Sequence, residues 1–192
     1  MATVIPPRTY ADEHVLLTIL MGYTGSLQGI DVDTLNEGIN ASCRVTKDGT
    51  RFSATASDTI TDDAALCQEG TPETLGGSNY EGNIQPFRFF DPENPGVADA
   101  EADEVFQALK RKGTEAVFVF RETGKRFDED WEAGDEYAAY RGTVDNWQRA
   151  ENMTGYIKRT IPVNEIQAEQ NGEVAASDAS SGDGSTGGET EG

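Results

Sequence analysis

A period-two alternation of apolar and polar residues between positions 39 and 57 constrains the fold more than any other feature. The segment Lys47–Thr50, which contains Gly49, divides the alternation into two halves. Two alternating runs around a glycine-containing turn are typical of a β-hairpin with one apolar and one polar face. The polar face, which includes Asn40, Ser42, Arg44, Ser53, Thr55 and Ser57, contacts either bulk water or a water-filled channel.

Other segments predict additional strands and a single helix. The segment Glu115–Glu122 is apolar on both faces and reads as a central strand, whereas Pro86 indicates an edge position or a bulge. The helix is expected over Asp99–Lys112, with acidic residues near its start, basic residues near its end and one apolar stripe. The remaining strands are expected at Val15–Met21, Tyr80–Phe90, Glu136–Val144 and Thr154–Val163. The sequence therefore predicts a mainly β protein, with an antiparallel sheet structure and one α-helix.

The chain divides into an arm, one domain and a tail. Residues 1–12 contain Pro6-Pro7 and are expected to form an N-terminal arm, and residues 13–167 to form the β domain. Residues 168–192 are acidic and rich in glycine and serine, so they are expected to be disordered because they cannot repay the entropy of ordering. Residues 58–78 are polar and are expected to form a loop that orders on contact with a partner.

The chain carries a large negative charge. It has 35 acidic and 15 basic residues, which gives a formal net charge of -20. Such a charge keeps copies soluble and excludes tight binding to nucleic acid phosphates. It suits a surface past which nucleic acid moves without adhering.

No catalytic, metal-binding or cofactor-binding constellation is recognisable. His14 is the only histidine, and Cys43 and Cys67 are too isolated for a zinc site and are expected to be free, packed thiols. The pair Asp31 and Asp33 lacks the later ligands and the glycine of a calcium loop. No apolar run approaches the roughly 20 residues that span a bilayer, so no membrane partner is expected. The protein is therefore predicted not to be an enzyme, with an acidic-site glycan hydrolase as the least favoured alternative.

The block from Asp135 to Ile166 contains two strand-like runs joined by a polar link. Large side chains in that link need a covering surface, which is either the core or another subunit. Trp147, Arg149 and Tyr156 are accordingly the candidate subunit-contact residues.

From Glu115 onward, the order of features resembles the tail tube, or major tail, proteins of long-tailed, non-contractile bacteriophages. The resemblance rests on the strand EAVFVFRE, the charged loop that ends in Ala133-Gly134-Asp135, the strand EYAAYRGTV, the link DNWQRAENMTG and the final strand YIKRTIPV. It extends to residues 39–58 and to the single helix.

This resemblance implies an antiparallel β-sandwich or barrel with one flanking α-helix and long assembly loops. It also implies a virion protein that forms hexameric rings, which stack into a tube that delivers the genome. It implies assembly in the host bacterial cytoplasm, with the tape measure, tail terminator and tail tip proteins as further partners, and passage of phage DNA without specific binding. The polar residues between Asn40 and Ser57 are then the candidate channel-lining set. A capsid decoration protein or a head-tail connector protein is the alternative, because it shares the acidity and the β fold.

Overall fold

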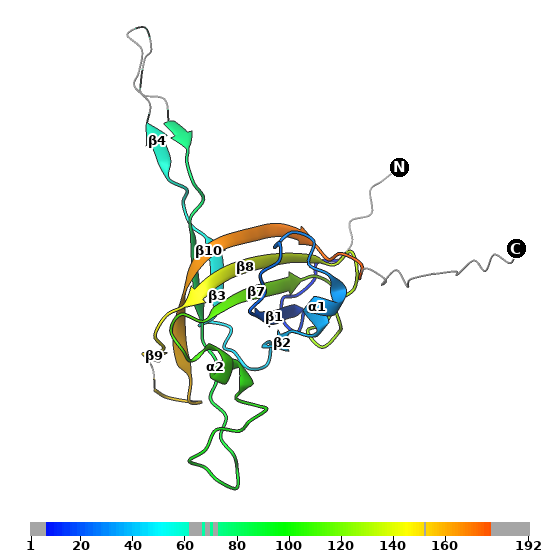
Figure 1. The fold of residues 1–192 in the computed structure, drawn as a ribbon, viewed down its shortest axis with the longest axis vertical. Helices are drawn as coiled ribbons and strands as arrows, with labels where there is room; N and C mark the ends of the chain where they lie inside the picture. The colour runs from blue at the N-terminus through cyan, green and yellow to red at the C-terminus, as the bar shows by residue number, and fades with distance from the viewer. Residues whose placement is uncertain (1–6, 62–66, 68–69, 71–72, 152, 178–192) are drawn as a thin grey trace, which may run out of the picture.

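The structure is a computed structural model that describes residues 7–61, 67, 70, 73–151 and 153–177. One antiparallel sheet dominates it, with the strand order β2-β1-β7-β8-β10-β6-β3 and the short β9 paired to β10. The strands are β1 Val15–Met21, β2 Ile39–Asn40, β3 Arg51–Ala54, β6 Tyr80–Ile84, β7 Glu115–Glu122, β8 Glu136–Val144, β9 Gln148–Arg149 and β10 Arg159–Glu173. The prediction of a mainly antiparallel β fold is confirmed (Figure 1).

The sheet curls back on itself, so that its two halves enclose a core. Phe52 of β3 stacks on Phe118 of β7 with 4.5 Å between the ring centroids, although three strands separate β3 from β7 in the sheet order. Leu17, Phe118 and Ile161 are buried in this core. The opposite faces of β1 and β7 pack against a second cluster, so these strands are buried on both sides, as the sequence predicts for β7.

The predicted hairpin between positions 39 and 57 is wrong. Ile39 in β2 pairs with Ile19 in β1, whereas Phe52 in β3 pairs with Gly82 in β6. The backbone N–H of Ala41 donates to the carbonyl of Leu17 at 2.8 Å, which continues the pairing with β1 beyond β2. The two halves of the alternation therefore lie at opposite ends of the sheet order, because a period of two specifies a buried face but not a neighbouring strand.

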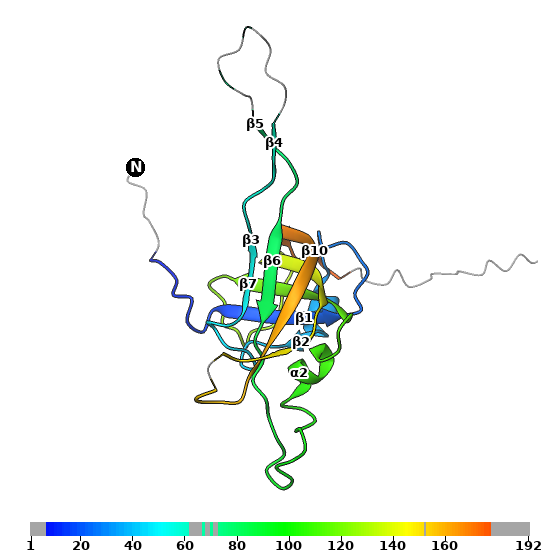
Figure 2. The same ribbon diagram turned by 90° about the vertical axis from the view of Figure 1, so that its left-hand side faces the viewer.

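A long hairpin replaces the polar loop that was predicted over residues 58–78. The ladder between β3 and β6 continues through a bond from Thr55 N–H to the Asn79 carbonyl at 2.8 Å. It then reaches β4 (Thr59–Thr61) and β5 (Glu73–Leu75), which pair with each other and with no other described strand. We call β4, β5 and the segments that join them to β3 and β6 the arm; it is distinct from the predicted N-terminal arm of residues 1–12. Figure 2 shows the arm projecting far from the β body.

Two short helices flank the sheet, where one was predicted. The helix α2 covers Glu104–Leu109 and is shorter than the predicted Asp99–Lys112, although its apolar stripe is buried as expected. Asp99 caps the preceding turn, since its carboxylate accepts a bond from Ala102 N–H at 2.7 Å. The helix α1, Val32–Asn36, was not predicted, and Asp31 caps it through a 2.9 Å bond from Thr34 N–H.

Two strand boundaries also differ from prediction. The strand β6 ends at Ile84, before Pro86, and it lies between β10 and β3 and not at an edge of the sheet. The strand β10 pairs with β8 as far as Glu173, so the domain boundary predicted at residue 167 falls inside a strand. Residues 178–192 of the predicted tail and residues 1–6 of the predicted N-terminal arm lie outside the described residues.

A buried guanidinium organises the charged loop between β7 and β8. The side chain of Arg121 is fully buried and donates to the carbonyls of Arg126, Glu129 and Asp130 at 2.7 to 2.9 Å. Its guanidinium also lies 3.3 Å from the Asp135 carboxylate. Burial alone would raise the pKa of Asp135, but bonds from Lys125 and from the backbone of Glu132, with both cations nearby, lower it. The loop is therefore a fixed part of the body.

Candidate assembly surface

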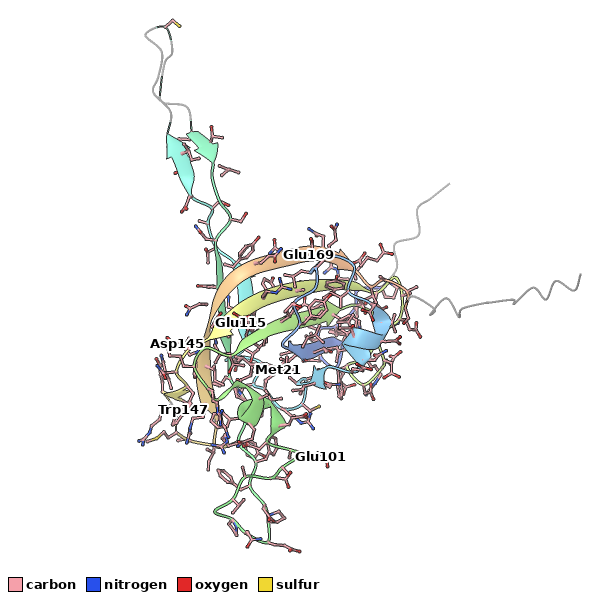
Figure 3. All side chains as sticks on the ribbon, viewed as in Figure 1. Met21, Glu101, Glu115, Asp145, Trp147 and Glu169 are labelled. Carbon is pink, nitrogen blue, oxygen red and sulfur yellow. The ribbon has the colours of Figure 1, made fainter. Side chains whose placement is uncertain are left out.

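The three predicted subunit-contact residues belong to one surface. Trp147 and β9, which contains Arg149, lie toward the end of the molecule away from the arm (Figures 1 and 3), and Tyr156 lines the same pocket as Arg149. Four apolar side chains are exposed there, with Met153 at 82% and Tyr156 at 83% of their maximum accessible area. Three basic residues lie in the same segment. We call this surface the end patch, and it consists of Trp147, Arg149, Met153, Tyr156, Ile157, Lys158 and Arg159.

Backbone pairing and ring contacts hold the end patch in place. Arg149 of β9 pairs with Arg159 at the start of β10, and Phe87 forms an isolated bridge with Lys158. The Arg159 guanidinium lies 5.1 Å from the centroid of the Trp147 ring, within the range of a cation–π interaction. Tyr156 contacts Phe87 edge-on, with 5.9 Å between the centroids. The patch therefore presents apolar groups on an ordered backbone.

The helix α2 packs against the end patch. Phe106 of α2 meets Trp147 edge-on at 6.2 Å, and the Arg88 guanidinium lies 4.0 Å from the centroid of the Phe106 ring. Asp103, which is buried, accepts bonds from Arg88 at 2.9 Å, Phe89 N–H at 3.0 Å and Gln107 at 2.6 Å. Burial alone would raise the pKa of Asp103, but these donors lower it. The carboxylate thus joins α2 to the segment that follows β6.

The basic residues of the patch differ from most others in having no acidic partner among the described residues. Arg149, Lys158 and Arg159 form no ion pair with any residue that the structure describes. By contrast, eight other basic residues form ion pairs with acidic side chains, namely Arg44, Lys47, Arg51, Arg88, Lys112, Arg121, Lys125 and Arg126. Three unpaired cations together are notable in a chain that carries 35 acidic residues.

The arm carries a second exposed apolar surface. Leu75 of β5 is 77% exposed and Ile60 of β4 is also exposed. An isolated pair of strands is marginally stable in water unless it packs against another surface. No described residue outside the arm pairs with β4 or β5. The arm is therefore a surface that gains stability when a partner covers it.

The candidate channel-lining residues form two separate groups. Asn40, Ser42 and Arg44 lie in and after β2, where the Ser42 hydroxyl accepts a bond from Leu17 N–H at 2.9 Å. Ser53, Thr55 and Ser57 lie in β3 and at the base of the arm. The hairpin that was expected to join them does not exist, and their contact with a channel stays a prediction.

The described residues include no cluster of metal-binding side chains. No group of three or more histidine, cysteine, aspartate or glutamate residues within the described ranges is placed to hold a metal ion. His14 bonds to the backbone carbonyl of Asp12 at 2.8 Å, and Cys43 and Cys67 are free and exposed, not packed as predicted. None of the helices in the described part of the chain has the length and apolarity to cross a membrane.

The family profile described as Phage tail tube protein matches residues 2–179. The chain belongs to this family. The match spans the β body, the arm and the end patch, and it confirms the resemblance inferred from the sequence. No curated protein matches the chain. As a tail tube protein, the chain is a structural component of the virion tail that assembles with itself and with other tail proteins.

Sequence reasoning named three of the seven end-patch residues as candidate contacts, and their contact with another subunit stays a prediction. Trp147, Arg149 and Tyr156 were predicted because large side chains in a polar link need a covering surface. Met153, in the same link, and Ile157, in the run expected to form the final strand, were not among the candidates. The lack of acidic partners for Lys158 and Arg159 depends on the fold and has no signal in the sequence.

Proposed function

We propose that this tail tube protein polymerises as hexameric rings that stack into a tube, and that the tube is a channel for genome delivery. The observation that carries the proposal is the projecting arm, whose Ile60 and Leu75 are exposed and are not covered by the residues that the structure describes. Membership in the family supports a tubular assembly, and the arm supplies a surface by which one copy reaches another.

The open edges of the sheet support closure within a ring. The strand β2 pairs only with β1, and β3 pairs only with β6, among the described strands. Exposed edges invite pairing with other chains, and joining the edges of neighbouring subunits removes them. Such joining brings the group Asn40, Ser42 and Arg44 of one subunit toward Ser53, Thr55 and Ser57 of its neighbour. The separation of the two groups in one chain is then compatible with one shared lining.

The acidity of the chain supports a channel for DNA. A lining of like charge avoids the release of counterions that drives proteins to bind DNA, so the genome passes without adhering. We infer that the tube is assembled in the host bacterial cytoplasm and contacts the tape measure, tail terminator and tail tip proteins. In this role the protein has no catalytic activity.

Electron microscopy of the purified chain tests the proposal. Negative-stain images at increasing concentration are expected to show hollow filaments, with sixfold symmetry in end views. Globular particles at every concentration would contradict polymerisation and would favour a capsid decoration or connector role. A reconstruction of the tube with a positive channel potential would contradict the acidic lining.

A further inference from the structure

We propose that the arm of one copy docks on the end patch of a second copy in the next ring, with acidic residues of the arm facing Arg149, Lys158 and Arg159. This inference rests on the proposed stacking of rings and identifies the surface that receives the arm. It is carried by charge, by exposed apolar groups and by the position of the two surfaces.

Charge is complementary between the two surfaces. Among the described residues between Ser53 and Tyr80, two are acidic and none is basic, the acidic residues being Asp58 and Glu73. Glu73 in β5 is exposed and forms no ion pair with a described residue. Between Trp147 and Arg159 there are three basic residues and only one acidic residue, Glu151. Since Arg149, Lys158 and Arg159 have no acidic partner within the described chain, an acidic arm from another copy supplies one.

Both surfaces also expose apolar side chains that a contact can bury. The arm offers Ile60 and Leu75, and the end patch offers Met153, Tyr156 and Ile157 beside the half-exposed Trp147. Aromatic residues and arginine are enriched where protein interfaces gain most of their binding energy. An apolar centre with charged residues around it is the usual arrangement of such an interface.

The positions of the two surfaces fit a head-to-tail contact. The arm projects from one end of the long axis, and β9 with Trp147 lies toward the other end (Figures 1 and 3). A contact between two different surfaces of identical chains is heterologous and builds an open array when its rotation does not close. Each copy therefore offers an arm in one direction and a patch in the other, as stacking requires.

A second apolar surface competes as the receiver of the arm. It is the groove formed by Val15, Leu17, Cys43, Val45, Phe120 and Phe127, with Asp12, Glu13, Glu122 and Lys47 also in its lining. Three of those four charged residues are acidic, and Lys47 is already paired with Asp12. An acidic arm is repelled there and attracted by the end patch. Charge thus selects the end patch.

Charge reversal in the patch tests the contact. Lys158→Glu, alone or with Arg149→Glu, is expected to raise the critical concentration for tube formation about tenfold or more, because attraction becomes repulsion. The matched control is Lys47→Glu, the same reversal in the competing groove, which is expected to leave tube formation unchanged. Adding Glu73→Lys in the arm is expected to restore assembly of the Lys158→Glu chain. Light scattering measures assembly, and circular dichroism checks that each variant is folded.

A disulfide cross-link locates the receiving surface directly. In a Cys67→Ser chain that keeps Cys43, Leu75→Cys and Met153→Cys are introduced, and mild oxidant is added to assembled tubes. A link between positions 75 and 153 of different copies supports the proposal. A link between position 75 and Cys43 places the arm in the groove, and tubes without either link also overturn the docking while the proposed function stands. If the unaltered chain forms no tubes at any concentration, the proposed function fails, and the docking fails with it.

Discussion

Removing the Asp103 carboxylate is expected to destabilise strongly the region around α2 and the end patch. Asp103 is 1% exposed, and its partner Arg88 is largely buried. In Asp103→Ala the Arg88 guanidinium keeps its burial but loses its counter-charge, and Phe89 N–H loses its acceptor. Breaking a buried pair from one side costs about 3–5 kcal/mol of unfolding free energy. That loss is a large fraction of the stability of a typical domain.

Urea unfolding followed by tryptophan fluorescence measures this loss. Trp147 reports on the region directly, because its ring contacts Phe106 of α2. The matched control is Asp99→Ala, which removes a partly exposed turn cap near the same helix and should cost about 1 kcal/mol. A loss in Asp103→Ala no larger than the loss in the control would refute the assignment of Asp103 as a buried anchor.

The same carboxylate has a predictable pH dependence. The folded protein holds the pKa of Asp103 below its ordinary value of 3.8, so the unfolded chain binds a proton more readily. Its contribution is therefore complete above the unfolded pKa and is lost as the pH falls below about 4 through the folded pKa. The difference in unfolding free energy between the native chain and Asp103→Asn should shrink over that window. A difference that stays constant from neutral pH to pH 3 contradicts the argument.

Two further predictions concern the sheet. Gly142→Ala in β8 should lower the unfolding free energy by about 1–3 kcal/mol, because an added Cβ lies 3.0 Å from the Asn164 carbonyl oxygen and against the Val163 side chain. The control in the same urea titration is Gly96→Ala, where the added Cβ meets open space. Truncation after Gln167 should lower the melting temperature by removing the pairing of β10 with Tyr137 and Ala139, whereas truncation after Ser177 should preserve it. Equal melting temperatures for the two truncations would contradict a stabilising role for the end of β10.

The central strands were predictable from sequence because local signals determine them. The observed strands β1, β7 and β8 have the predicted bounds, which are Val15–Met21, Glu115–Glu122 and Glu136–Val144. Each is an apolar run with clear limits, and Gly22, which follows β1, adopts a φ of 66° that few other residues tolerate. The two strand-like runs of the block from Asp135 to Ile166 lie in β8 and β10, which pair with each other.

Strand partners and the end of β10 were not predictable in the same way. The alternation around Ile39 and Phe52 defines which side chains are buried, but the partners of β2 and β3 are distant in sequence. The stretch from Ala168 to Glu173 is polar, so it was assigned to the tail. It nevertheless forms a strand, because its backbone pairs with β8. Gly172 lies against the Tyr137 ring, where a larger residue would collide with it. That close approach is invisible in composition.

The distribution of charge reconciles strong acidity with self-assembly. A net charge of -20 makes most surfaces of two copies repel each other, which suppresses contacts in the wrong register. In the proposed contact, the unpaired cations of the end patch are the place where an acidic arm meets attraction. Since the screening length falls from about 10 Å at 0.1 M salt to about 3 Å at 1 M, high salt weakens both the general repulsion and this attraction. At high salt the burial of apolar side chains therefore contributes most of the binding free energy. In the proposed contact, the charges of the acidic body and the basic patch determine the register, and the apolar residues determine the strength.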